Sequence, residues 1–249
     1  MDSKQPIIEV DHVTMRFNLS TERLYSIKEY CIQFLTRKLR FDAFCALKDI
    51  SFQIAPGDSV ALIGKNGSGK STMLKTIAGV MYPTEGTVTV RGSITPLIEL
   101  GAGFDTELTA RENIYLNGAV LGYDRNYMST HFDEIVDFAE LWDFVDVPIK
   151  NFSSGMVARL GFAIATIARG DILVVDEILA VGDFAFQEKC KAKMAELMAG
   201  GTTLLFVSHS EDQVKELCRK AIWIDQGELI AYGETGEVYE MYKRKYANG

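Results

Sequence analysis

Residues 64–71 read Gly-Lys-Asn-Gly-Ser-Gly-Lys-Ser, a spacing of glycines, lysine and hydroxyl that can bind phosphate. Glycines let a backbone curl until successive N–H groups face one anion. An apolar run at 59–63 predicts a strand before this phosphate loop, and residues 72–78 predict a helix after it. The positive end of that helix would lie at the same place. A glycine-rich turn with a chance lysine is the simpler alternative, but it requires neither flanking element.

This phosphate loop predicts a nucleoside triphosphate as its ligand. Lys70 is expected to contact the β- and γ-phosphates and so to serve catalysis, and Ser71 to ligate Mg²⁺. The predicted nucleotide-binding residues here are Gly64, Lys65, Asn66, Gly67, Ser68, Gly69, Lys70, Ser71 and Thr72.

An acidic pair, Asp176 and Glu177, directly follows an apolar run at 172–175. Ligands of open α/β sheets bind at the carboxyl ends of the strands. Asp176 is therefore predicted to hold Mg²⁺ through its shell, and Glu177 to act as the base on an attacking water. Taken alone, the pair could equally be a solvated turn.

His209 follows another apolar run, at 203–207, and Ser208. A lone histidine is more often structural than catalytic. Its place after a strand, downstream of the acidic pair, favours an imidazole that touches the γ-phosphate and orients the water.

A second candidate anion site is the segment Phe-Ser-Ser-Gly-Met at 152–156, which we call the signature segment. Hydroxyls and a glycine at a helix start can cap the helix and can also bind an anion. One nucleotide hardly needs two such helix starts. The sequence therefore predicts that the second site serves the nucleotide of another copy, in a head-to-tail homodimer with ATP between the subunits. A plain helix cap is the alternative.

Strand-forming and helix-forming runs alternate around these groups. This order predicts an α/β fold with a mostly parallel sheet. Strands are also expected at 7–13, 46–54 and 86–92, and a helical subdomain is expected as an insertion at about 104–165, where Thr109 and Glu112 fit a capping box. Further helices are expected near 153–168, 186–199, 211–219 and 234–246.

Composition sets the broad class. With 249 residues, 47% of them hydrophobic and 24% charged, the chain is an ordinary globular protein. Its net charge of −8 disfavours a nucleic-acid partner. The four cysteines form no CxxC pair and indicate a reducing compartment. No apolar run approaches the ~18 residues of a membrane span, and there is no signal-peptide pattern. A soluble, cytoplasmic chain is expected.

The order of the motifs resembles the nucleotide-binding subunit of ABC transporters, over nearly the whole chain. That family's usual signature is Leu-Ser-Gly-Gly-Gln, where this chain has Phe-Ser-Ser-Gly-Met. The runs at 97–104, 107–114 and 178–183 look like those of ATPases that export O-antigen, capsule or teichoic-acid polysaccharides.

The resemblance implies a single ABC ATPase domain over 1–249, with an antiparallel β edge and an insertion at about 18–44. It implies ATP and Mg²⁺ as ligands, a homodimer, and two integral-membrane permease subunits that handle a lipid-linked polysaccharide. The chain would then lie at the cytoplasmic face of the inner membrane as a peripheral protein. An ABC ATPase for another substrate, or a nucleotide-gated adaptor with little turnover, is the alternative.

The resemblance also assigns roles at the dimer interface and the metal. Gly155, with Ser153 or Ser154, would contact the partner's γ-phosphate, and Met156 in place of glutamine removes an amide there. Asp183 would belong to a loop that meets the other subunit. Where the family has a glutamine near the metal, the nearest polar residue here is Glu99.

Adenine is expected to stack on an aromatic ring near the end of the first strand. Phe17 is the predicted residue, with Phe41 and Phe44 as alternatives.

The segment at 20–44 carries apolar residues at helical spacing and a basic cluster of Arg37, Lys38 and Arg40. One hypothesis is a helix at the membrane surface that helps to admit an anionic lipid-linked glycan. The alternative is an amphipathic helix packed on its own domain.

Overall fold

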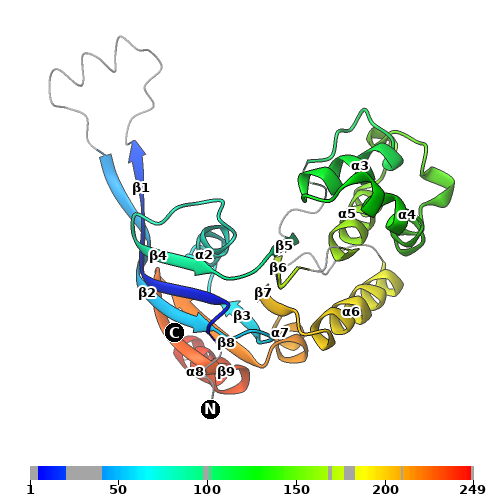
Figure 1. The fold of residues 1–249 in the computed structure, drawn as a ribbon. Helices are drawn as coiled ribbons and strands as arrows, with labels where there is room; N and C mark the ends of the chain where they lie inside the picture. The colour runs from blue at the N-terminus through cyan, green and yellow to red at the C-terminus, as the bar shows by residue number, and fades with distance from the viewer. Residues whose placement is uncertain are drawn as a thin grey trace, which may run out of the picture.

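The computed structural model describes residues 5–20, 41–97, 101, 103–167, 170–176, 183–208 and 210–247. It contains two sheets and a group of helices, arranged as two arms joined at the larger sheet (Figure 1). The α/β fold class predicted from the sequence is confirmed.

The smaller sheet is antiparallel and has the order β2-β1-β4. Its strands are β1 (Ile8–Ser20), β2 (Phe41–Ile54) and β4 (Glu85–Val90). β1 and β2 extend further than the predicted strands, and Phe17 pairs with Phe44 within the extension. Ser20 and Phe41 form the outermost described pair, so the predicted insertion overlaps residues that are strand. The rest of that segment, including Arg37, Lys38 and Arg40, lies outside the described residues.

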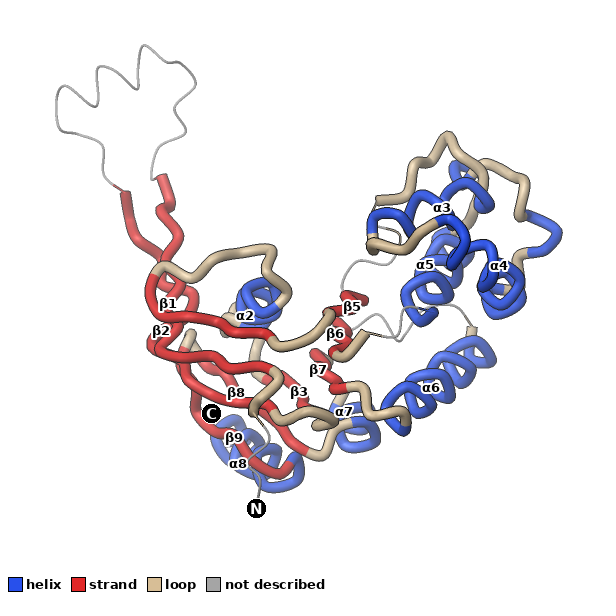
Figure 2. The backbone as a smooth tube through the Cα atoms, viewed as in Figure 1, coloured by secondary structure: helices blue, strands red, loops and turns tan. Residues whose placement is uncertain are grey.

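The larger sheet has the order β5-β6-β7-β3-β8-β9, in which the pairs from β5 to β8 are parallel and β9 is antiparallel. In Figure 2 its strands run from β5 and β6, between the two arms, to β8 and β9 at the lower left. The strands are β3 (Ser59–Ile63), β5 (Ile94–Leu97), β6 (Ile172–Asp176), β7 (Thr203–Val207), β8 (Lys220–Asp225) and β9 (Glu228–Glu234).

Both faces of the larger sheet are covered. Because successive side chains of a strand point to opposite faces, Val60 and Leu62 of β3 join one apolar cluster with the smaller sheet and α2 (Lys70–Ile77). Ala61 and Ile63 join a second apolar cluster on the opposite face, with residues of four helices. Those helices are α5 (Ser154–Ile167), α6 (Phe184–Ala199), α7 (Glu211–Leu217) and α8 (Thr235–Ala247).

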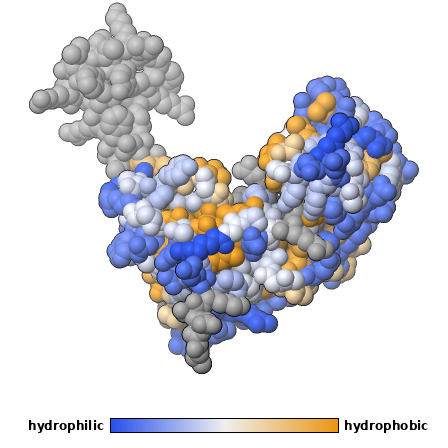
Figure 3. All heavy atoms as spheres, viewed as in Figure 1, coloured by the Kyte–Doolittle hydropathy of each residue, from blue (hydrophilic) through white to orange (hydrophobic). Residues whose placement is uncertain are grey.

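The second arm is helical. It contains α3 (Ala110–Val120), α4 (Arg125–Ala139), α5 and the 3-10 turns η1 (Trp142–Phe144) and η2 (Ile149–Asn151). These elements have an apolar cluster of their own. The capping box predicted at Thr109 and Glu112 is confirmed and begins α3. Figure 3 shows a hollow between this arm and the one that carries α2.

Candidate functional site

The phosphate loop joins the buried strand β3 to α2, as the motif predicts. Gly64, Gly67 and Gly69 have φ values of 150°, 76° and 95°, a backbone conformation that residues with a side chain rarely adopt. A Cβ on Gly64 would lie 2.2 Å from the carbonyl oxygen of Ile224, and one on Gly69 would lie 2.3 Å from that of Ala46. Glycine is therefore required at both positions by backbone conformation and by space.

Lys70 lies inside this loop. Lys70 is only 7% exposed, and its Nζ donates hydrogen bonds to the carbonyl oxygens of Gly64 (3.0 Å) and Lys65 (3.3 Å). The first turn of α2 carries no acidic residue, so the positive end of the helix is not neutralised locally. Ser71 is exposed and Thr72 half-buried at this helix start. The arrangement suits a polyphosphate.

The loop's remaining residues fit the same ligand. Lys65, Asn66 and Gly67 are exposed, whereas the hydroxyl oxygen of Ser68 is buried with no hydrogen-bond partner among the described residues. The loop therefore presents its surface from Lys65 to Gly67 to solvent, while Ser68 packs inward.

Asp176 lies at the same edge of the sheet as the phosphate loop. Val207 of β7 pairs with Leu62 of β3 on one side and with Asp176 on the other. Two interstrand spacings, about 10 Å, therefore separate the backbones of Leu62 and Asp176. The Ser71 hydroxyl and the Asp176 carboxylate are hard oxygen donors of the kind that Mg²⁺ prefers.

Within the described ranges, no group of three or more His, Cys, Asp or Glu residues could hold a metal ion. Ser71 and Asp176 suit Mg²⁺, which accepts one or two protein oxygen ligands and takes the others from phosphate and water. Glu99, the third predicted metal ligand, lies outside the described residues.

Two predicted catalytic residues, Glu177 and His209, also lie outside the described residues. Their neighbours in the chain are described. Asp176 ends β6. Ser208 follows β7 and is only 5% exposed. The Ser208 hydroxyl is 3.0 Å from Oε1 of Gln213 and accepts a hydrogen bond from the N–H of Ser210. The roles of Glu177 and His209 stay predictions.

The signature segment leads into α5. The Ser153 hydroxyl accepts a hydrogen bond from the N–H of Met156 (3.2 Å), which is the capping contact that the plain alternative predicts. Ser154 is exposed and Gly155 half-buried at the helix start. Met156 packs against the apolar cluster of the helical arm, which accounts for an apolar residue where the family has an amide.

Asp183 caps the start of α6, where its carboxylate accepts a hydrogen bond from the N–H of Phe186 (3.0 Å). Nη2 of Arg159, from α5, lies 2.6 Å from the same carboxylate. The hydrogen bond from Phe186 and then the charge of Arg159 lower the pKa of Asp183. Asp183 thus links α6 to α5 within one chain, and its contact with a second copy stays a prediction.

Two of the three adenine candidates lie opposite each other. Phe17 and Phe44 are paired across β1 and β2, two residues along β2 from Ala46, whose carbonyl borders Gly69. Phe17 is half-buried against the core, whereas Phe44 is 50% exposed. Phe41 is paired with Ser20, farther along the strands. The register thus brings Phe17 and Phe44 nearer to the phosphate loop than Phe41.

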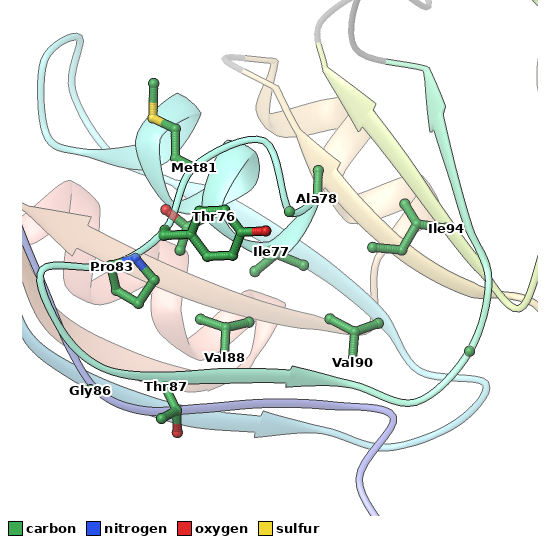
Figure 4. A pocket seen from close by; sticks show the side chains of 13 residues that line it. Thr76, Ile77, Ala78, Met81, Pro83, Gly86, Thr87, Val88, Val90 and Ile94 are labelled. Atoms are coloured by element: carbon green, nitrogen blue, oxygen red, sulfur yellow. The ribbon is translucent and has the colours of Figure 1, made fainter. Parts of the chain in front are cut away.

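A pocket of about 680 Å³ lies at the other end of α2. Figure 4 shows it between the end of α2 and β4, lined by Ile77, Met81, Val88 and Val90 among others. This lining is largely apolar and lies away from the helix start, so the pocket is separate from the phosphate-binding loop.

The C-terminal helix also reaches the phosphate loop, which the motif did not predict. Nζ of Lys65 lies 3.7 Å from the ring centroid of Tyr246 in α8. The two residues are far apart in the sequence, and no local pattern at either position indicates the contact.

Comparison with known proteins assigns this chain to a family. The ABC transporter family matches residues 47–180. An O-antigen export system ATP-binding protein, RfbB, from Klebsiella pneumoniae is 42% identical over 97% of this chain and 99% of its own length. A teichoic acids export ATP-binding protein, TagH, from Listeria innocua is 43% identical over 94% of this chain and 69% of its own length.

Solved structures agree on the fold. The ATP-binding subunit of an ABC transporter superposes with a TM-score of 0.75 at 20% identity, covering 95% of this chain and 93% of that one. The ATP-binding cassette MJ0796, in a dimeric state bound to ADP and Pi, superposes with a TM-score of 0.72 at 22% identity, covering 92% and 98%. With its phosphate loop, its acidic strand end and its match over most of its length, the chain belongs to the ABC transporter family, as an ATP-hydrolysing subunit.

Proposed function

We propose that this chain hydrolyses ATP to drive export of a lipid-linked polysaccharide through a separate membrane permease. Support comes from its similarity, over almost its full length, to proteins named for O-antigen export and teichoic acid export. The observation that carries the catalytic part is the phosphate loop itself, in which Lys70 is buried in a loop of positive-φ glycines at a helix start without acidic residues.

The active unit in this proposal is a homodimer. The signature segment begins α5 on the helical arm, whereas the phosphate loop begins α2 on the other arm (Figures 1 and 2). The two candidate anion sites of one chain are thus on separate arms, which favours their meeting across two chains. Ser154, Gly155 and Asp183 would then contact the partner.

Within each site the residues divide the work. Lys70 and the N–H groups of the loop neutralise phosphate charge, Glu177 takes a proton from the attacking water, and His209 orients that water. Mg²⁺ bound by Ser71 and Asp176, with Glu99 as the third proposed ligand, would neutralise charge on the phosphate oxygens. Phe17 or Phe44 supplies a ring for adenine.

A membrane partner completes the proposal. Of the helices in the described part of the chain, none is both long and apolar enough to cross a bilayer. We infer that two copies of the chain bind two permease subunits at the cytoplasmic face of the cell membrane. Closure of the ATP-bound dimer and its opening after hydrolysis would move the permease.

Export in the native host tests this function. Deleting the gene should remove the surface polysaccharide and leave lipid-linked glycan inside the cell, and the wild-type chain should restore export. Surface and internal glycan are measured by immunoblot with the permease gene intact. Unchanged export after deletion would contradict the transport role, whatever ATPase activity the purified chain has.

The basic cluster in the segment at 20–44 has its own test. Replacing Arg37, Lys38 and Arg40 by alanine should lower glycan export severalfold but leave the ATPase activity of the purified chain intact, because a polybasic surface attracts anionic lipid headgroups. Export equal to wild type would support the alternative that the segment packs on its own domain.

A further inference from the structure

The last turn of α8 carries a cluster of aromatic and charged side chains that faces the phosphate loop. Tyr246 is packed among the rings of Trp223 and Tyr242, with centroid separations of 6.2 and 5.0 Å. Trp223 is 1% exposed, on β8, the strand next to β3. The position of the Tyr246 ring is therefore fixed by the core of the larger sheet.

Lys65, the second residue of the phosphate loop, lies on this ring. Its Nζ is 3.7 Å from the Tyr246 centroid, well within the reach of a cation–π interaction. Lys65 is exposed to solvent, so ordinary loop packing does not explain its orientation.

Asp225 places negative charge beside the same contact. It ends β8 with its side chain 10% exposed, and Lys245 of α8 lies 2.7 Å from its carboxylate. The Lys245 ammonium lowers the pKa of Asp225, and the Tyr246 hydroxyl and the charge of Lys65 act in the same direction. Asp225 therefore stays ionised near neutral pH and favours a cation at Lys65.

The backbone is tight at the same point. Gly64 approaches the carbonyl of Ile224, which precedes Asp225, so closely that no Cβ would fit. The phosphate loop thus leaves β3 against the end of β8, and α8 covers that junction through Tyr246 and Lys245.

We propose that Tyr246 is a positioning residue for ATP binding, which holds Lys65 and so keeps the first turn of the phosphate loop in its binding conformation. It does not contact the nucleotide in this proposal. A loop that is held ready binds its ligand with less ordering cost, and the apparent Kd scales inversely with the populated fraction of the competent state. The inference rests on the proposed role of the loop in holding ATP.

A double-mutant cycle on the purified full chain tests it, with binding of ATP and Mg²⁺ measured by isothermal titration. Tyr246→Leu should raise the Kd about twofold to fivefold, the range of an exposed cation–π contact. In ATPase assays it should raise KM and leave kcat close to wild type, because the reacting groups are untouched. In a Lys65→Met background, Tyr246→Leu should have no further effect on the Kd.

Two variants serve as controls. Tyr246→Phe removes the hydroxyl, which interacts with Asp225, but keeps the ring under Lys65, so it should bind ATP as the wild type does. Lys243→Met, on the same helix, breaks an ion pair with Glu211 of α7 (2.8 Å) and should also leave the Kd unchanged. Thermal unfolding verifies that each variant is folded.

Three results would overturn the proposal: an unchanged Kd for Tyr246→Leu, an effect of the same size in the Lys65→Met background, or weakened binding in Tyr246→Phe. If Tyr246→Leu has the same effect in the Lys65→Met background, Tyr246 acts only through the packing of α8. Failure of the proposed function is distinct, because then the wild-type chain would bind no ATP or Lys70→Ala would bind it normally.

Discussion

Replacing Lys70 by alanine is expected to reduce ATP hydrolysis by at least about a hundredfold, the typical loss when one preorganised charge donor is removed from a phosphoryl-transfer site. The Lys70 ammonium is buried and held by the carbonyls of Gly64 and Lys65. Its removal takes away the only side-chain cation that the loop directs inward, and leaves those two carbonyls without its hydrogen bonds. Phosphate release and ATP titration measure the two losses.

Lys75→Ala is the matched control, because Lys75 is in the last turn of the same helix, away from the loop. It should hydrolyse ATP within about twofold of wild type, in line with the small effects of substitutions outside a site. Equal losses in the two variants would show a general effect on α2 and would remove the specific role of Lys70.

The phosphate loop and the capping box could be predicted from the sequence because their determinants are local. A strand, a run of glycines and a helix follow one another in the chain, so residues 64–71 carry their own context. Thr109 and Glu112 are likewise three residues apart, and both hydrogen bonds of the box form between them.

The smaller sheet was only partly predicted, because bulges break its alternation. The register of β1 and β2 shifts between Val10 and Val13, and His12 and Asp49 have positive φ values of 50° and 51°. A bulge moves the following side chains to the other face. The apolar alternation therefore changes phase between Val10 and Val13 and resumes at Val13, Met15 and Phe17, within a strand that continues to Ser20.

β5, β8 and β9 were not predicted. β5 contains Pro96, which cannot donate to a ladder, and it pairs only at the sheet's edge with β6. β8 is a short apolar run between Lys220 and Asp225, and its fit in the sheet depends on β3, far away in the chain.

Contacts between distant segments also limit what the sequence tells about the site. The need for glycine at Gly69 comes partly from Ala46, and the orientation of Lys65 comes from Tyr246. The choice between Phe17 and Phe44 likewise depends on the register of two strands. Residue types indicate the chemistry here, but only the fold indicates which neighbours hold them.

Glu177→Gln is the second substitution with a large expected effect. Removing a general base costs typically a hundredfold to ten-thousandfold in rate, so we expect turnover of ATP to fall to near background. Glutamine keeps the size and polarity of the side chain but cannot accept the proton of the attacking water. ATP binding depends on the phosphate loop and should persist, and steady-state phosphate release checks the rate.

The same variant should accumulate as an ATP-bound dimer. In the proposed cycle hydrolysis opens the closed dimer, so a site that binds ATP but cannot cleave it has no route to opening. Size-exclusion chromatography with light scattering should show a dimer with ATP and Mg²⁺ and a monomer without them.

Adding Ser154→Arg to the signature segment should abolish that dimer while leaving ATP bound to the monomer, because a bulky cation at an exposed helix start would block the partner's approach. Normal turnover in Glu177→Gln would mean that Glu177 is not the general base. A dimer that survives Ser154→Arg would mean instead that the two chains meet through another surface.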